Sequence, residues 1–183
     1  MMKPKPILSL IAAGFLAGLA GCQSLQANSY QIQFACDESL NSSNNEYIYT
    51  TVASDSLRHH RTIIRWETQD FSGNGFPPKE RCHKVSPRFQ QAYDTDKLKF
   101  LTHGTMNKQP VICTARGLGE ECDTLIMTLR HSDDADKTLA HLSKILRGGA
   151  TTGLEHDSGD VHEVGGRKYV EIDIEHFLSL PES

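Results

Sequence analysis

Residues 110–129 read PVICTARGLGEECDTLIMTL, in which two apolar runs flank a polar segment that contains glycines. The first run ends at Cys113, and the second follows Cys122. Short apolar runs on either side of such a segment predict two paired antiparallel strands, over residues 110–114 and 124–130. A disulfide between the two cysteines would close this hairpin and contribute about 2–3 kcal/mol in the chain-entropy model.

Strand patterns continue on both sides of the hairpin. Alternating or β-branched runs predict further strands over residues 30–36, 47–53, 62–66, 98–102 and 169–174. Residues 38–46 are rich in Asn and Ser, and residues 150–166 are rich in Gly, Thr and Asp, so both segments are expected to be loops. Residues 106–109 are expected to be a turn, and residues 176–178 a short tail.

Two helices are predicted. The first begins near Pro78, and Pro87 within it predicts a kink, or a restart with Ser86 as the N-cap. The second begins at the capping and acidic residues 132–134 and ends at Gly148. The buried faces are expected to be Cys82, Val85, Phe89 and Ala92 in the first helix, and Leu139, Leu142, Ile145 and Leu146 in the second. These elements predict a single small α+β domain with a mostly antiparallel sheet, stapled by disulfides.

The amino terminus has the features of an export signal. Two lysines precede an apolar run that ends in Leu19-Ala20-Gly21-Cys22, and the chain becomes polar directly afterwards. The run is shorter than the roughly 20 apolar residues of a membrane-spanning helix. The last four residues resemble the lipobox of bacterial lipoproteins, which implies lipidation of Cys22. The alternative is an ordinary cleaved signal followed by a chance cysteine.

The lipobox predicts a location as well as a modification. Several acyl chains on Cys22 would anchor the protein stably, whereas one chain binds a membrane only marginally. We therefore expect an exported, lipid-anchored protein that faces the periplasm or lies at the outer membrane. Anchoring to a thylakoid or plasma membrane is an alternative. Gln23 is not the aspartate that typically retains lipoproteins at the inner membrane.

The cysteine count agrees with export. The chain has five cysteines, and lipidation of Cys22 leaves an even set: Cys36, Cys82, Cys113 and Cys122. Disulfides persist in an oxidising compartment, and four cysteines allow three pairings. The hairpin favours Cys113–Cys122, which leaves Cys36–Cys82 to tie an early strand to the first helix. A zinc site is the alternative, although the usual Cys-x-x-Cys spacing is missing.

The overall charge excludes one class of partner. The formal net charge is −4, and basic residues form no extended block. A protein that binds nucleic acid normally presents a basic field, so we expect no nucleic-acid partner. The expected organisation is a signal peptide over residues 1–21, a polar tether over 22–33, the main domain over 34–149, and a loop with a last strand and tail over 150–183.

Short motifs follow one another in order between residues 34 and 147, although each is weak alone. They are Phe34-x-Cys36, Thr51-Val52, Ile63-Ile64-Arg65-Trp66, Phe71…Gly75…Pro78, Arg81-Cys82, Val85-Ser86-x-Arg88-Phe89-Gln90, Leu101-Thr102-x-Gly104, Asn107 and Pro110-Val111-Ile112-Cys113. Together they resemble the circadian oscillating polypeptide family of cyanobacteria. The resemblance implies a membrane-associated envelope protein. The resemblance implies no catalytic activity, and no active-site residues can be inferred from it.

Three groups of residues are candidate sites. Arg65, Trp66, Arg81 and Arg88 could form a recognition patch, but a structural network is favoured. Residues 58–61 (RHHR) could touch anionic headgroups, but a solvated loop is favoured. His156, Asp160 and His162 are weak metal candidates, because imidazole and carboxylate suit divalent ions but their spacing is not distinctive. No catalytic residue, metal site or cofactor is predicted.

The leading functional hypothesis is a membrane-anchored envelope lipoprotein that serves as a non-enzymatic binding or interaction module. Its partners would be the membrane, through the lipid, and an envelope protein. The catalytic motifs of serine hydrolases, zinc proteases and phosphate-binding loops are missing from the sequence. Two alternatives remain open: an envelope hydrolase, and a metal-binding protein that uses residues 156–163.

Overall fold

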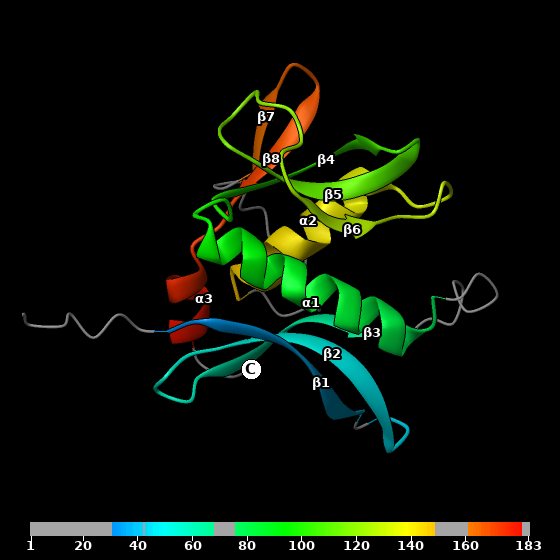
Figure 1. The fold of residues 1–183 in the computed structure, drawn as a ribbon, viewed down its shortest axis with the longest axis vertical. Helices are drawn as coiled ribbons and strands as arrows, with labels where there is room; N and C mark the ends of the chain where they lie inside the picture. Colours follow the sequence, from blue (N-terminus) through cyan, green and yellow to red (C-terminus); the bar gives the residue numbers. More distant parts are fainter. Residues whose placement is uncertain (1–30, 42, 68–75, 149–160, 181–183) are drawn as a thin grey trace, which may run out of the picture.

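The computed structural model describes residues 31–41, 43–67, 76–148 and 161–180. Two helices lie between two antiparallel sheets (Figure 1). One sheet has the order β1-β2-β3, and the other has the order β6-β5-β4-β8-β7. The strands are β1 (Gln33–Asn41), β2 (Glu46–Ser54), β3 (His60–Trp66), β4 (Phe100–Met106), β5 (Gln109–Ala115), β6 (Leu125–Thr128), β7 (Val161–Val164) and β8 (Arg167–Glu171). The helices are α1 (Pro78–Asp94), α2 (Ala135–Leu146) and α3 (Ile174–Ser179).

The helical layer places one hydrophobic core between the sheets. Helix α1 contacts all three strands of the first sheet and also β6, whereas α2 contacts β4, β5 and β8 and also β3. Phe89 of α1 is 1% exposed, and its ring stacks on Phe34 of β1 with the ring centroids 5.6 Å apart. Leu139 of α2 and Val170 of β8 belong to the same buried cluster. The α+β class and the antiparallel pairing predicted from the sequence are therefore confirmed.

A second, smaller buried layer lies on the other face of the five-stranded sheet. Val111, Cys113 and Tyr169 are buried there but lie outside the main core cluster. The loop between β5 and β6 covers them: the Tyr169 hydroxyl donates to the carbonyl of Glu120 at 2.9 Å, and Arg167 pairs with Glu121 at 2.9 Å. The Cys113–Cys122 disulfide ties this loop to β5.

Several boundaries differ from the predictions. Strand β1 continues through residues 38–41, which were expected to be a loop, because each of these residues pairs with β2. Strand β7 occupies part of the expected loop 150–166, and residues 149–160 lie outside the described part of the chain. The expected tail is a short third helix, α3, whose N-cap Asp173 accepts a bond from the amide of His176 at 2.8 Å.

The prediction of a restart at Pro87 is wrong, because α1 runs without interruption from Pro78 to Asp94. Pro87 lies on the exposed side of the helix. Ser86 does not cap a helix; its hydroxyl is buried and donates to the Thr51 hydroxyl at 3.0 Å. The second predicted helix is present, but its N-cap is Asp134, whose carboxylate accepts from the amide of Lys137 at 3.0 Å. None of the described helices is long and apolar enough to cross a membrane.

Gly104 on β4 gives the Cys113–Cys122 disulfide the space that it occupies. A Cβ atom at Gly104 would lie 2.7 Å from Sγ of Cys122, closer than real Cβ contacts. We expect Gly104→Ala to lower the free energy of unfolding by about 1–3 kcal/mol, the usual cost of overpacking. Guanidinium denaturation, followed by the fluorescence of the single tryptophan, Trp66, measures this change.

Two comparisons make this prediction specific to the disulfide. Gly117→Ala is the matched control, because a Cβ there comes no closer than 3.8 Å to any neighbouring atom. In a variant with alanine at both Cys113 and Cys122, the cost of Gly104→Ala should fall well below its value in the wild type. An equal cost in both backgrounds would show that some other contact makes glycine necessary at this position.

Candidate functional site

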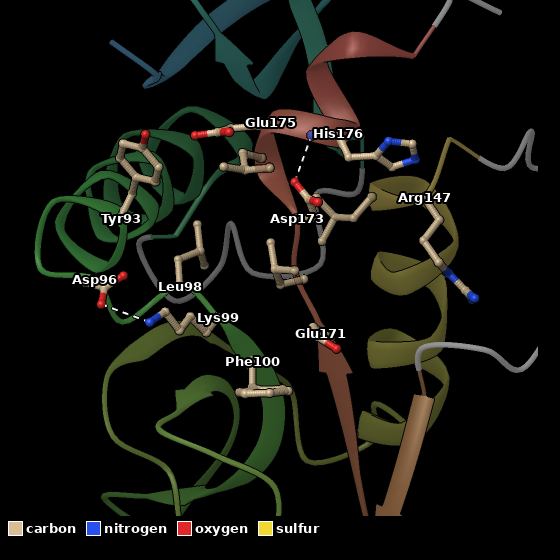
Figure 2. A pocket seen from close by; sticks show the side chains of 13 residues that line it. Tyr93, Asp96, Leu98, Lys99, Phe100, Arg147, Glu171, Asp173, Glu175 and His176 are labelled. Carbon is tan, nitrogen blue, oxygen red and sulfur yellow. Dashed lines mark hydrogen bonds and ion pairs between the residues drawn. The ribbon is translucent and has the colours of Figure 1, made fainter. Parts of the chain in front are cut away.

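An open pocket lies at the end of the helical layer where α1 stops. Its volume is about 590 Å³. Four segments that are distant in sequence supply its lining: the C-terminal end of α1, the start of β4, the C-terminal end of α2, and the stretch from the end of β8 into α3 (Figure 2).

Local hydrogen bonds fix these four segments against one another. The amide of Lys97 donates to the carbonyl of Ala92 at 2.8 Å, which turns the chain out of α1 and toward β4. The amide of Ile172 donates to the carbonyl of Lys99 at 2.8 Å and thereby holds the end of β8 beside β4. The N-cap bond of Asp173 then starts α3 at the pocket wall. The pocket is therefore a product of tertiary structure.

The floor of the pocket is apolar. Leu98 and Ile174 are each 7% exposed and Leu146 is 6% exposed, and all three belong to the hydrophobic core. Phe100 and Ile172 also line the pocket and are half-buried. An apolar floor with polar groups at its edge is the usual composition of a small-molecule site.

Carboxylates dominate the edge. The pocket is lined by Asp96, Glu171, Asp173 and Glu175, against Lys99, Arg147 and His176. Asp96 pairs with Lys99 at 3.0 Å, and Asp173 caps α3. Within the described part of the chain, Glu171 and Glu175 form no ion pair. Among the described residues, the edge therefore carries two carboxylates that no Lys, Arg or His side chain contacts at ion-pair distance.

Tyr93 lies at the edge of the pocket close to Glu175. Burial raises the pKa of the Tyr93 phenol above its ordinary value, and the negative charges of Glu175 and Asp94 raise it further. The carboxylate of Glu175 points toward the Tyr93 hydroxyl (Figure 2). Tyr93 is thus a neutral phenol in the ordinary pH range.

The cysteine pairs are those that the sequence favoured. Cys36 of β1 is joined to Cys82 of α1 with a Cα–Cα distance of 5.4 Å, and Cys113 is joined to Cys122 with a distance of 5.5 Å. Cys22 lies outside the described residues.

Of the four residues considered as a recognition patch, Trp66 and Arg81 lie together, whereas Arg65 and Arg88 each contact other partners. Trp66 is 6% exposed, and its indole N–H donates to the Thr51 hydroxyl at 3.0 Å, while the Arg81 guanidinium lies 5.2 Å from the centre of the Trp66 ring. Arg65 is exposed and pairs with Glu67 at 2.9 Å. Arg88 donates to the carbonyl of Ile126 on β6 at 3.2 Å. These contacts support the structural interpretation of the four residues.

The basic run 58–61 leads into β3: residues 58 and 59 are exposed and precede the strand, and His60 and Arg61 are its first two residues. Asp55 accepts bonds from the amides of Leu57 and His59, each at 2.9 Å, and also pairs with the His59 ring at 2.6 Å. The side chain of Arg61 packs against α3, with its guanidinium 4.9 Å from the centre of the Phe177 ring. The run therefore presents no continuous basic surface.

Of the weak metal candidates, His162 lies on β7. His156 and Asp160 fall outside the described residues. Across residues 31–41, 43–67, 76–148 and 161–180, no group of three or more His, Cys, Asp or Glu side chains is placed to hold a metal ion.

Sequence reasoning did not find the pocket. Its lining residues carry no motif, and they come together only when α1, β4, α2 and β8 are packed. One signal was present: the segment 171–176, EIDIEH, alternates acidic with apolar residues, which suits an edge that is charged outside and apolar beneath. Its local pattern predicts only the end of a strand and a tail.

The ordered motifs that carried the family resemblance support the fold. Gln90 is an example: its side-chain carbonyl accepts from the amide of Phe34 at 2.7 Å, and its amide donates to the carbonyl of Ile32 at 3.4 Å, so it continues the pairing of β1. Ser86, Arg88 and Gly104 have the structural roles described above. None of these residues lines the pocket.

Comparison with known proteins agrees with that resemblance. The family model described as circadian oscillating protein COP23 matches residues 33–179. The match confirms the resemblance and extends it beyond residue 147, through β7, β8 and α3. No curated protein and no solved structure matches the chain. Because the family model covers most of the sequence, the chain belongs to the circadian oscillating protein COP23 family.

Proposed function

We propose that the protein is an exported lipoprotein whose disulfide-bonded domain serves as a non-enzymatic binding module at a membrane surface. In this proposal the lipid on Cys22 holds the domain at the membrane, and the pocket beyond α1 receives a ligand or a segment of an envelope protein. The bound molecule, and not a chemical reaction, carries the function.

One observation carries the proposal. The chain has five cysteines, and four of them form the pairs Cys36–Cys82 and Cys113–Cys122. The remaining cysteine, Cys22, directly follows Leu19-Ala20-Gly21, the residues that a lipobox requires. Disulfides persist where thiols are not kept reduced, which supports export. Lipidation of Cys22 agrees both with the pairing of the other four cysteines and with the motif that precedes Cys22.

The Cys22 anchor is testable by intact mass and by detergent phase partition of the protein made with its signal segment in a bacterial host. We expect the wild-type protein to carry a diacylglyceryl thioether at Cys22 and to enter the detergent phase. Cys22→Ser should lose the lipid mass and move to the aqueous phase, because no other thiol can accept the lipid.

Ser24→Ala is the matched control, since it alters a polar residue two positions away and keeps Cys22. This variant should partition like the wild type. A wild-type protein whose mass shows no acylation would contradict the proposal at its first step.

A further inference from the structure

We propose that the pocket beyond α1 binds a small organic cation that has an apolar body. This inference rests on the proposed binding function and names the chemical class of the ligand. It follows from three properties of the pocket: its unbalanced negative charge, its apolar floor and its volume.

The carboxylates at the pocket edge favour a positively charged ligand. Glu171 and Glu175 have no cationic partner within the described residues, whereas Asp96 is neutralised by Lys99 at 3.0 Å. The side chains of Arg147 and His176 lie on the α2 side of the site, away from Tyr93 and Asp96 (Figure 2). An anionic ligand would approach these carboxylates at a cost, while a cation would balance them.

The apolar floor and the volume of the pocket favour a small ligand with an apolar body. Leu98, Ile174 and Leu146 are core residues that end at the pocket, so a ligand with an apolar body would cover surface that water otherwise contacts. Tyr93 adds an aromatic ring at the edge, and cations bind favourably over such rings. A volume of about 590 Å³ suits a small molecule, because small-molecule pockets span roughly 300–1,000 Å³.

The position of the pocket agrees with a membrane-surface role. The chain enters the domain on this side: Gln90 holds Ile32 and Phe34, and the Phe34 ring lies 5.9 Å from the Tyr93 ring. Since an extended residue spans at most about 3.6 Å, a lipid on Cys22 would keep this end of the domain within roughly 35 Å of the membrane.

The test compares three aromatic probes of different charge. Benzyltrimethylammonium is a permanent cation, benzyl alcohol is neutral and benzoate is an anion. Calorimetric titration of the full-length protein in a non-ionic detergent should show binding of the cation at millimolar concentration or below. Benzyl alcohol should bind at least about tenfold more weakly, and benzoate more weakly still.

Variants locate the site. Glu171→Gln and Glu175→Gln keep the shape of each side chain and remove its charge; each should weaken the binding of benzyltrimethylammonium about threefold, and the double variant about tenfold. Glu38→Gln is the matched control, because Glu38 is an exposed carboxylate on β1 that does not line the pocket. It should leave the affinity unchanged.

A second readout comes from Tyr93. Negative charge contributes to the raised pKa of its phenol, so a bound cation should lower that pKa toward its ordinary value. NMR titration of the Tyr93 ring resonances with and without benzyltrimethylammonium measures this shift.

Equal binding of the cation and benzyl alcohol, equal weakening by Glu38→Gln, or no binding at millimolar concentration would each overturn the inference. Its failure is distinguishable from that of the lipid anchor. An unacylated Cys22 together with cation binding would remove the anchor and keep the site, whereas an acylated Cys22 without cation binding would do the reverse.

Discussion

Replacing both Cys36 and Cys82 with alanine is expected to lower the free energy of unfolding by about 4 kcal/mol. The bond joins β1 to α1 across 46 positions of sequence, and Cys82 is fully buried. In the chain-entropy model, the cross-link restricts the unfolded chain more strongly as the closed loop grows. A loss of this size is a large fraction of the 5–15 kcal/mol that stabilises a typical domain.

The second disulfide is the internal control. Cys113–Cys122 closes a loop of only 9 positions, so alanine at both cysteines should cost about 2.5 kcal/mol. Guanidinium denaturation under oxidising conditions, followed by Trp66 fluorescence, gives both values. A cost for the Cys36–Cys82 pair no greater than that for Cys113–Cys122 would show that restriction of the unfolded chain does not dominate its effect.

The elements that could be predicted from the sequence are those with a strong local pattern. The β4–β5 turn is one: Asn107 and Lys108 both have positive φ values, as a two-residue hairpin turn requires, and residues 106–109 were predicted to be that turn. The hairpin around Cys113 and Cys122 is another, because apolar runs, glycines and cysteines agree there. Helix α2 was marked by acidic residues before it and glycine after it.

The errors arise where tertiary contacts override local composition. Residues 38–41 have a loop-like composition, yet they extend β1 because β2 provides a partner for each of them, and the Ser39 hydroxyl lies 3.1 Å from the Thr50 hydroxyl. Ser86-Pro87 has the composition of a helix start, yet packing of the neighbouring residues against β2 continues α1 through it.

The pocket could not be predicted for a related reason. Tyr93, Lys99, Leu146 and Glu171 lie in four separate segments, and no spacing in the sequence connects them. The family motifs did not help, because the residues that they share support the fold: Gln90 pairs with β1, and Gly104 leaves room for Cys122. A motif that identifies a family therefore need not identify its site.

Phe89→Ala is expected to lower the free energy of unfolding by about 3–5 kcal/mol, the usual cost of deleting a buried phenylalanine side chain. Phe89 of α1 is 1% exposed, and its ring stacks on Phe34 of the first sheet. Both sheets contact α1 and α2. A sheet that moved toward α1 to fill the cavity left by the Phe89 ring would therefore lose contacts with α2.

Phe76→Ala is the matched control, because the same atoms are removed from a side chain that is 41% exposed and contacts Lys84. Surface substitutions typically change stability by no more than about 0.5 kcal/mol. Phe89→Leu should recover part of the loss, since it refills some of the cavity. If Phe89→Ala were no more destabilising than Phe76→Ala, the two sheets would not depend on one shared core, and the layered arrangement would have to be held mainly by Cys36–Cys82 and the strand pairing.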